Sequence, residues 1–165
     1  MTTSLILASQ SPRRRDYLRQ LGYQFSSESA DIDESVLISE KPVDYVARLS
    51  AEKARFIAKN HNDTTIVLGA DTCVVVDDEI LGKPIDLADC IRQLTLLSGR
   101  THQVYTAVSV VSGQQVKTRT VGADVTFKAL SIDEITRYWH TGEPCDKAGA
   151  YGIQGSAGHF VKQIN

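Results

Sequence analysis

The sequence predicts an α/β protein in which long strands cross a twisted, mixed sheet and helices flank it. One observation is the β-branched apolar run TTIVLGAD at residues 64–71, which has the composition of a buried strand. Another is the segment at residues 42–60, where apolar side chains recur with the period of a helix. Two hairpins break any regular β-α repeat. Neither GxGxxG nor GxxxxGKS/T follows the first strand, so the Rossmann and P-loop fingerprints do not apply.

The order of elements begins with a strand at residues 5–8 and a helix at residues 12–21, for which Ser11-Pro12 supplies the N-cap and the first turn. A second cap signal, a capping box of Ser131 and Glu134, begins a helix over residues 131–140. The other predicted elements are a weak strand at 24–27, an acidic loop at 28–42, the helix at 42–60, the strand at 64–71, a hairpin over 72–81 turning at Asp77-Asp78, a helix at 86–97 closed by Gly99, a hairpin over 101–127 and an irregular glycine-rich segment over 146–158.

Composition bounds the function. The 165 residues suit a single domain, and 42% hydrophobic with 23% charged residues is ordinary for a soluble globular protein. The net charge of −2 gives no general attraction to nucleic acid or to a membrane surface, so any affinity for anions must come from local clusters. A nucleic-acid-binding module is further disfavoured because no aromatic-basic surface pattern is present.

Cysteine usage and the N-terminus predict a cytoplasmic protein. Cys73, Cys90 and Cys145 are an odd number without metal-type spacing, which favours reduced thiols over a disulfide framework. Cys73 falls in a buried strand pattern and is expected in the core. No apolar h-region opens the chain, and no apolar run has the length of a membrane span.

Three consecutive arginines, Arg13, Arg14 and Arg15, occupy the predicted first turn of a helix. This is the unfavourable end for cations, because the helix N-terminus carries the positive pole of the macrodipole. Together with Ser9 and the free backbone N–H groups of a strand–helix corner, arginines there would bind an anion such as phosphate. The alternative is that they only face solvent.

Lys53 stands out in the helix at residues 42–60 because its angular position places it on the inward side. An inward lysine either extends its ammonium group to solvent or meets a buried anion. In the second alternative, the most specific hypothesis is that the anion is a phosphate group of a ligand bound in a cleft.

Asp71 is predicted to end the strand at residues 64–71, where open α/β sheets bind ligands. It could act as a general base, a metal ligand or both, or only cap a turn. The small residues Gly69 and Ala70 before it would let another group approach the backbone.

Three further residues are weaker candidates. Glu34 lies in an acidic loop with Asp31 and Asp33, where carboxylates could hold magnesium or simply be solvated. Lys83 follows Gly82 in a loop without a local partner. Gln154, in the glycine-rich segment, has an amide that could pair with the edge of a base, although a bulged turn explains the glycines equally well.

The candidates comprise cations on distant segments, one strand-end carboxylate and one acidic loop. No serine or cysteine nucleophile has an evident base. This combination fits attack by water on a polyphosphate, with a metal ion sharing the charge. The motifs LILASQSPRRRDYLRQLG, DIDES, AEKA, VLGADT, LGKP, LSGRTHQVYTAV and DKAGAYGIQG occur in this order. They strongly resemble the Maf family of nucleoside triphosphate pyrophosphatases. The resemblance implies an ITPase-like fold with an elongated sheet and two lobes around a cleft.

The resemblance also implies a reaction and a set of site residues. Members hydrolyse a nucleoside triphosphate to the monophosphate and pyrophosphate with a divalent metal, magnesium or manganese. By resemblance, Asp71 is the proton acceptor and Glu34 is the acidic residue of the metal site. Asp71, as a strand-end carboxylate, is the other expected metal ligand. The substrate-binding positions are Ser9, Arg13, Arg14, Lys53 and Lys83.

SPRRR, GADT and GIQG resemble the type that acts on dTTP and UTP rather than the type that acts on 7-methyl-GTP. The specificity positions then fall on Arg13, Thr72 and Gln154. A different class remains as the alternative: a nucleotide-binding regulator of cell division and septum formation without catalysis. The resemblance also raises a homodimer as a partner state.

Family members usually continue beyond the position of Asn165 with a further segment and a closing helix. We therefore expect a single Maf-like domain over residues 1–165 that lacks this C-terminal segment, with a consequence for stability and for any dimer contact.

Overall fold

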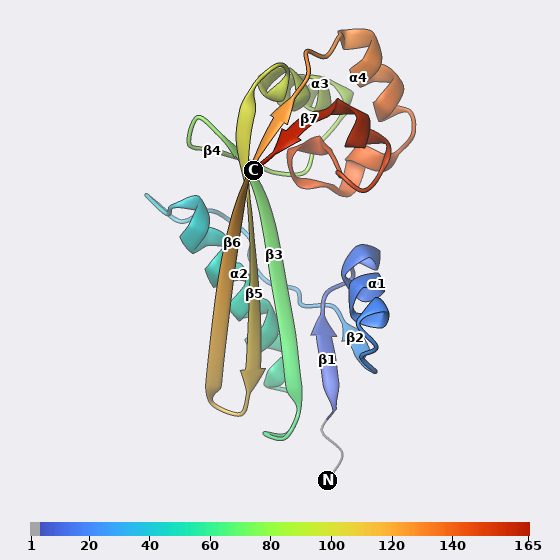
Figure 1. Cartoon of the computed structure of the whole chain (residues 1–165). Coiled ribbons are helices and arrows are strands. Elements are labelled where there is room, and N and C mark those ends of the chain that lie inside the picture. Colours follow the sequence, from blue (N-terminus) through green and yellow to red (C-terminus); the bar gives the residue numbers. More distant parts are fainter. Residues whose placement is uncertain (1–3) are drawn as a thin grey trace. The chain divides into compact units, whose positions relative to one another are not determined.

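The computed structural model describes residues 4–165, and over these residues it contains one mixed sheet with flanking helices (Figure 1). The strands are β1 (Leu5–Ala8), β2 (Ser26–Glu28), β3 (Ile66–Val76), β4 (Glu79–Leu81), β5 (Thr101–Ser112), β6 (Gln115–Phe127) and β7 (Val161–Ile164). The helices are α1 (Pro12–Gln20), α2 (Pro42–Ala58), α3 (Leu87–Leu97) and α4 (Ile132–Trp139), with three short 3-10 turns, η1 (Glu143–Asp146), η2 (Ala148–Ala150) and η3 (Ser156–Phe160).

The sheet runs in the order β2-β1-β3-β5-β6-β7, with β4 paired to β3. β1 is parallel to both β2 and β3, whereas β4 and β7 pair antiparallel. The predicted α/β class and mixed sheet are therefore confirmed. The chain divides into two compact units, of which unit 1 holds residues up to Asp71 and Thr106–Val121, and unit 2 holds Thr72–Tyr105 and Gly122–Asn165.

Unit 1 is built on the parallel strands β1, β2 and the first part of β3. Its core is apolar and formed by β1, α2, β3 and β5, with the members Ile6, Ala8, Ala54, Ile57, Val67 and Val111. α2 buries a face with helical spacing because apolar residues recur every three or four positions along it. Val43 has the same spacing but is 41% exposed. It lies in the first turn of α2.

Unit 2 packs α3, α4 and the short turns against the remaining strand segments around a larger apolar core. Asp77 and Asp78 form the β3–β4 turn with positive φ angles of 50° and 63°, as a tight hairpin turn requires. The predicted capping box of Ser131 and Glu134 is present at the start of α4. Gly99, with φ of 68°, follows the end of α3 as expected.

Three sequence expectations need correction. Asp71 does not end a strand, because β3 continues without interruption to Val76 and pairs there with β4. The strand expected at residues 24–27 is Ser26–Glu28, where it pairs with β1. The strand β7 was not expected, since its residues are mostly exposed and only pairing with β6 defines it.

Candidate active site

The corner between β1 and α1 turns one arginine toward the sheet. Arg14 Nη1 donates to the backbone oxygen of Ala70 in β3 at 2.7 Å and to Ser9 Oγ at 3.4 Å. Ser9 is buried, and its hydroxyl also accepts from the backbone N–H of Ser11 at 3.2 Å. Ser11 is the N-cap by position, although its side chain makes no capping bond. The corner therefore presents a fixed guanidinium beside the backbone that leads into Asp71.

Lys53 of α2 lies between two carboxylates. Its Nζ is 2.7 Å from Asp71 Oδ1 and 2.9 Å from Glu34 Oε1. The Lys53 and Asp71 side chains are 11% and 10% exposed, whereas Glu34 is 49% exposed in its loop. Of the two alternatives for an inward lysine, the structure shows the one in which the ammonium group meets a buried anion.

Gly69 explains how α2 comes so close to β3. A Cβ at this position would lie 2.1 Å from the Ser50 backbone oxygen and 2.9 Å from the Ala54 backbone nitrogen. Only a glycine therefore fits between the strand and the helix. Gly69 and Asp71 share a face of β3 because strand residues alternate in direction. The close approach thus sets Lys53, in the same turn of α2, beside Asp71.

Hydroxyl groups hold the same helix to the β5–β6 hairpin. Ser50 Oγ donates to the Ala47 carbonyl and lies 2.7 Å from Ser109 Oγ of β5, which is itself 2.7 Å from Thr118 Oγ1 of β6. Ser50 and Ser109 are fully buried. Buried hydroxyls that are paired in this way fix one position of α2, because any shift would leave a polar group without a partner.

Opposing influences act on the Asp71 carboxyl group. Burial raises its pKa above the ordinary value of 3.8, while the Lys53 and Arg14 cations lower it and the Glu34 carboxylate raises it. The net direction is upward. For Arg14, burial is the largest influence and lowers the pKa, although nearby Asp71 opposes this. A buried carboxylate with an elevated pKa and adjacent cations has the properties of a general base that handles protons near anionic substrate groups.

The acidic loop contributes one carboxylate to this cluster. Glu34 reaches Lys53, whereas Asp33 accepts hydrogen bonds from the backbone and hydroxyl of Ser35. Over residues 4–165 no group of three or more His, Cys, Asp or Glu side chains is arranged to hold a metal. Two carboxylates that converge on one ammonium group do suit a divalent cation that also takes substrate phosphate oxygens as ligands.

The three arginines of α1 differ in their surroundings. Arg14 faces β3, Arg13 is exposed, and Arg15 lines a separate cavity between α1 and β2. Successive helix residues are rotated by about 100°, so neighbours in sequence cannot share one direction. Of the three arginines, only Arg14 therefore lies beside Ser9 and β3, and anion binding at this corner stays a prediction.

The remaining predicted site residues, Thr72, Lys83 and Gln154, belong to unit 2. Lys83 and Gln154 are exposed. Their two loops adjoin, because the Gly149 N–H donates to the Gly82 carbonyl at 3.1 Å. Thr72 follows Asp71 in β3, so its side chain points to the opposite face of the strand.

Sequence reasoning missed a buried histidine in unit 2. His102 Nε2 lies 2.7 Å from the hydroxyl oxygen of Tyr151, and burial lowers the His102 pKa to about 4. The ring also packs edge-on against Phe127. His102 is the second residue of β5, and the alternation of that strand was the only sequence feature that could have predicted its burial. In the structure it is a core residue.

Comparison with solved structures first defines the class by fold. The nucleoside-triphosphatase/dITP/XTP pyrophosphatase of Mycobacterium abscessus superposes with a TM-score of 0.51 at 16% identity, covering 76% of this chain and 74% of that one. The Ham1 protein of Staphylococcus aureus gives a TM-score of 0.53 at 14% identity, covering 76% and 72%. The fold is therefore ITPase-like, as the resemblance to the Maf family implies.

Comparison of sequences then gives the family. The profile of the family described as Maf-like protein matches residues 4–165, and the chain belongs to this family. A dTTP/UTP pyrophosphatase of Colwellia psychrerythraea is 54% identical, covering 98% of this chain and 78% of that relative. Proteins of the same name from Aliivibrio fischeri and Vibrio parahaemolyticus are 52% and 53% identical, covering 100% and 98% of this chain and 88% and 85% of theirs.

Across the described residues, no helix has the length and apolar character needed to cross a membrane.

Proposed function

We propose that the chain hydrolyses nucleoside triphosphates, dTTP and UTP in preference to others, to the nucleoside monophosphate and pyrophosphate. The observation that carries the proposal is the buried Asp71 carboxylate, held at 2.7 Å by Lys53 beside the Arg14–Ser9 corner. This arrangement places a proton acceptor next to two cations. The chain is also about half identical in sequence to proteins named dTTP/UTP pyrophosphatase.

In the proposed reaction a water oxygen forms a new bond to the α-phosphorus, and the anhydride bond between the α- and β-phosphates breaks. Asp71 takes the proton of the attacking water, and pyrophosphate leaves with the electron pair of the broken bond. Arg14 and Lys53 stabilise the negative charge that develops on the phosphate oxygens, which is the largest contribution in most reactions of this type. Ser9 adds a hydroxyl hydrogen bond, and Lys83 is proposed as a further phosphate-binding cation.

A divalent cation, magnesium or manganese, is proposed to bind Glu34 and Asp71. Such an ion shares the charge of the phosphate oxygens and lowers the pKa of bound water. The convergence of the two carboxylates on Lys53 supports the assignment. With the cation beside Glu34 and Asp71, Lys53 would turn from these carboxylates toward the phosphates.

Preference for uracil and thymine is proposed to rest on Arg13, Thr72 and Gln154. The pairing edge of these bases offers two carbonyls and one N–H, which an amide and a guanidinium can match. Cytosine replaces one carbonyl by an amino donor, which would face the donor groups of Arg13 or Gln154 and leave a hydrogen bond unmade.

The cellular setting is proposed to be the cytoplasm, with a homodimer as the proposed partner state. The three cysteines support the first point, since all are free thiols: Cys73 and Cys90 are buried and Cys145 is exposed. Disulfides are rare in a reducing cytosol.

The test is a panel of UTP, dTTP, CTP, ATP and GTP with magnesium or manganese, scored for both monophosphate and pyrophosphate. Metal-dependent release of pyrophosphate from UTP and dTTP is expected. Lys53→Met should abolish most of it, whereas the matched Lys59→Met, at the exposed C-cap of α2, should not. Binding of nucleotides without any release of pyrophosphate would instead support a non-catalytic regulator.

A further inference from the structure

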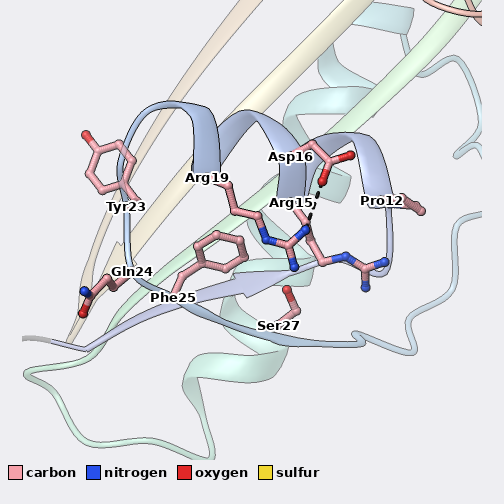
Figure 2. Close-up of a pocket in the computed structure, with 8 residues that line it drawn as sticks. All are labelled: Pro12, Arg15, Asp16, Arg19, Tyr23, Gln24, Phe25 and Ser27. Carbon is pink, nitrogen blue, oxygen red and sulfur yellow. Dashed lines mark hydrogen bonds and ion pairs between the residues drawn. The ribbon is translucent and has the colours of Figure 1, made fainter.

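Arg15 is the one of the three arginines that the proposed reaction does not use, and it lines a cavity of its own. This cavity has a volume of about 540 Å³ and lies between α1 and the edge strand β2 (Figure 2). Its walls are formed by Pro12, Arg15, Asp16, Arg19, Tyr23, Gln24, Phe25 and Ser27. It shares no residue with the cluster around Lys53, and its volume falls within the range of small-molecule sites.

The polar groups of the cavity suit an anion. Figure 2 shows the guanidinium groups of Arg15 and Arg19 directed over β2, with the Ser27 hydroxyl beneath them. Arg19 pairs with Asp16 at 3.0 Å, an exposed pair of the kind that contributes little to stability. Within residues 4–165, neither the Arg15 guanidinium nor the Ser27 hydroxyl has a side-chain hydrogen bond or ion pair. Two cations against one carboxylate leave the cavity with a net positive charge.

An aromatic surface lies beside these groups. The ring of the half-buried Phe25 stands next to the Arg19 side chain in Figure 2, and Tyr23 lines the same cavity. Aromatic rings stack on nucleobases whatever the base, and arginine forks bind phosphate through two oxygens. An anion site that adjoins an aromatic platform favours a ligand with both a phosphate and a flat ring.

We propose that this cavity is a second nucleotide site, which binds a nucleoside monophosphate outside the catalytic cluster. The phosphate binds Arg15, Arg19 and the Ser27 hydroxyl, and the base stacks on Phe25. Asp16 opposes binding, because it holds Arg19 and repels the phosphate.

The experiment measures binding of adenosine 5′-monophosphate to the full chain carrying Lys53→Met, which removes the central cation of the catalytic cluster. Amide resonances of Gln24 and Ser27 report on the cavity directly. Arg15→Gln should weaken binding by at least about tenfold, because a charge-assisted hydrogen bond is lost. Phe25→Leu should weaken it by about fivefold or more through loss of stacking. Asp16→Asn should tighten it by about twofold, since a competing exposed ion pair is removed.

Arg55→Gln is the matched control, because it removes the same charge from an exposed position of α2 and should leave the affinity unchanged. Ser27→Ala, which alters no charge, serves if Arg15→Gln does not fold. The proposal is overturned if the dissociation constant is the same in Arg15→Gln and Arg55→Gln, if adenosine binds as tightly as its monophosphate, or if inorganic phosphate does. This experiment measures binding and not turnover. A negative result would therefore overturn the second site without affecting the proposed hydrolysis of UTP.

Discussion

Replacing Gly69 by alanine tests whether close packing of α2 on β3 places Lys53 beside Asp71. The added Cβ would lie 2.1 Å from the Ser50 backbone oxygen and 3.0 Å from Ala54 Cβ. To reach an ordinary carbon–oxygen contact of about 3.3 Å, the helix and strand must separate by about 1.2 Å. Backbone atoms form the closest contact, so a change of side-chain rotamer cannot relieve it.

The same separation acts on the lysine. If the Lys53 side chain keeps its conformation, its 2.7 Å distance to Asp71 grows to about 3.9 Å, beyond hydrogen-bond reach. Overpacking of a core costs about 1–3 kcal/mol. For a chain of this size, each kcal/mol lowers Tm by about 2–4 °C, so a fall of about 2–12 °C is expected. Misplacement of a catalytic group by about 1 Å can reduce turnover by about 100-fold.

Thermal unfolding and UTP turnover of Gly69→Ala are the measurements. Gly82→Ala is the matched control for stability, because its added Cβ would meet no atom within 4 Å. Full turnover together with a Tm lowered by less than about 2 °C would refute the reasoning, since it would show that the helix absorbs the methyl group without moving Lys53.

The other predictions concern the chemistry. Asp71→Asn should reduce turnover by about 100- to 10,000-fold with nucleotide affinity largely kept, as single-turnover and equilibrium binding measurements would show. The acidic limb of the pH profile of kcat/KM should lie above pH 3.8, because the Asp71 pKa is raised. Glu34→Gln should move this limb to lower pH, and Lys53→Met should move it to higher pH. A limb that stays in place in both variants would contradict the assignment of the limb to Asp71. Lys53→Met should lower turnover far more than the Tm. Gln154→Glu should reduce discrimination between UTP and CTP more than it slows hydrolysis of a permissive triphosphate, which competition assays would measure.

The linkage between protonation and stability has a definite sign for Asp71. A carboxyl whose pKa is higher in the folded than in the unfolded state binds more protons when folded, so the free energy of unfolding falls as pH rises from 3.8 through the folded pKa. Removing Asp71 as a titrating group should therefore flatten that part of the stability profile.

How far the sequence predicted the site can be seen from Lys53 and Glu34. Helical periodicity placed Lys53 inward, because burial of one face of α2 follows from local spacing. The local sequence marks Glu34 only as one of several carboxylates in an acidic loop, and Glu34 reaches Lys53 only through the tertiary fold. The resemblance to a family supplied what spacing could not.

The strand that carries Asp71 shows the opposite kind of error. The β-branched run of β3 continues through residues 72–76, and no glycine or proline interrupts it after Asp71. A strand end was inferred from the polar side chain alone, although a carboxylate can occupy a strand interior when a lysine faces it. β7 could not be predicted either, because three of its four residues are exposed and its identity depends on pairing with β6.

The position of Lys53 between two carboxylates has a consequence for the timing of the proposed reaction. While Lys53 remains on Asp71, its charge lowers the proton affinity of that carboxylate and so opposes the rise in pKa that burial causes. A triphosphate that draws the ammonium group away removes this restraint at the moment when water must lose a proton. The proton affinity of the base would then rise upon arrival of substrate and fall again when pyrophosphate departs, so the protein would reset its own base in every cycle.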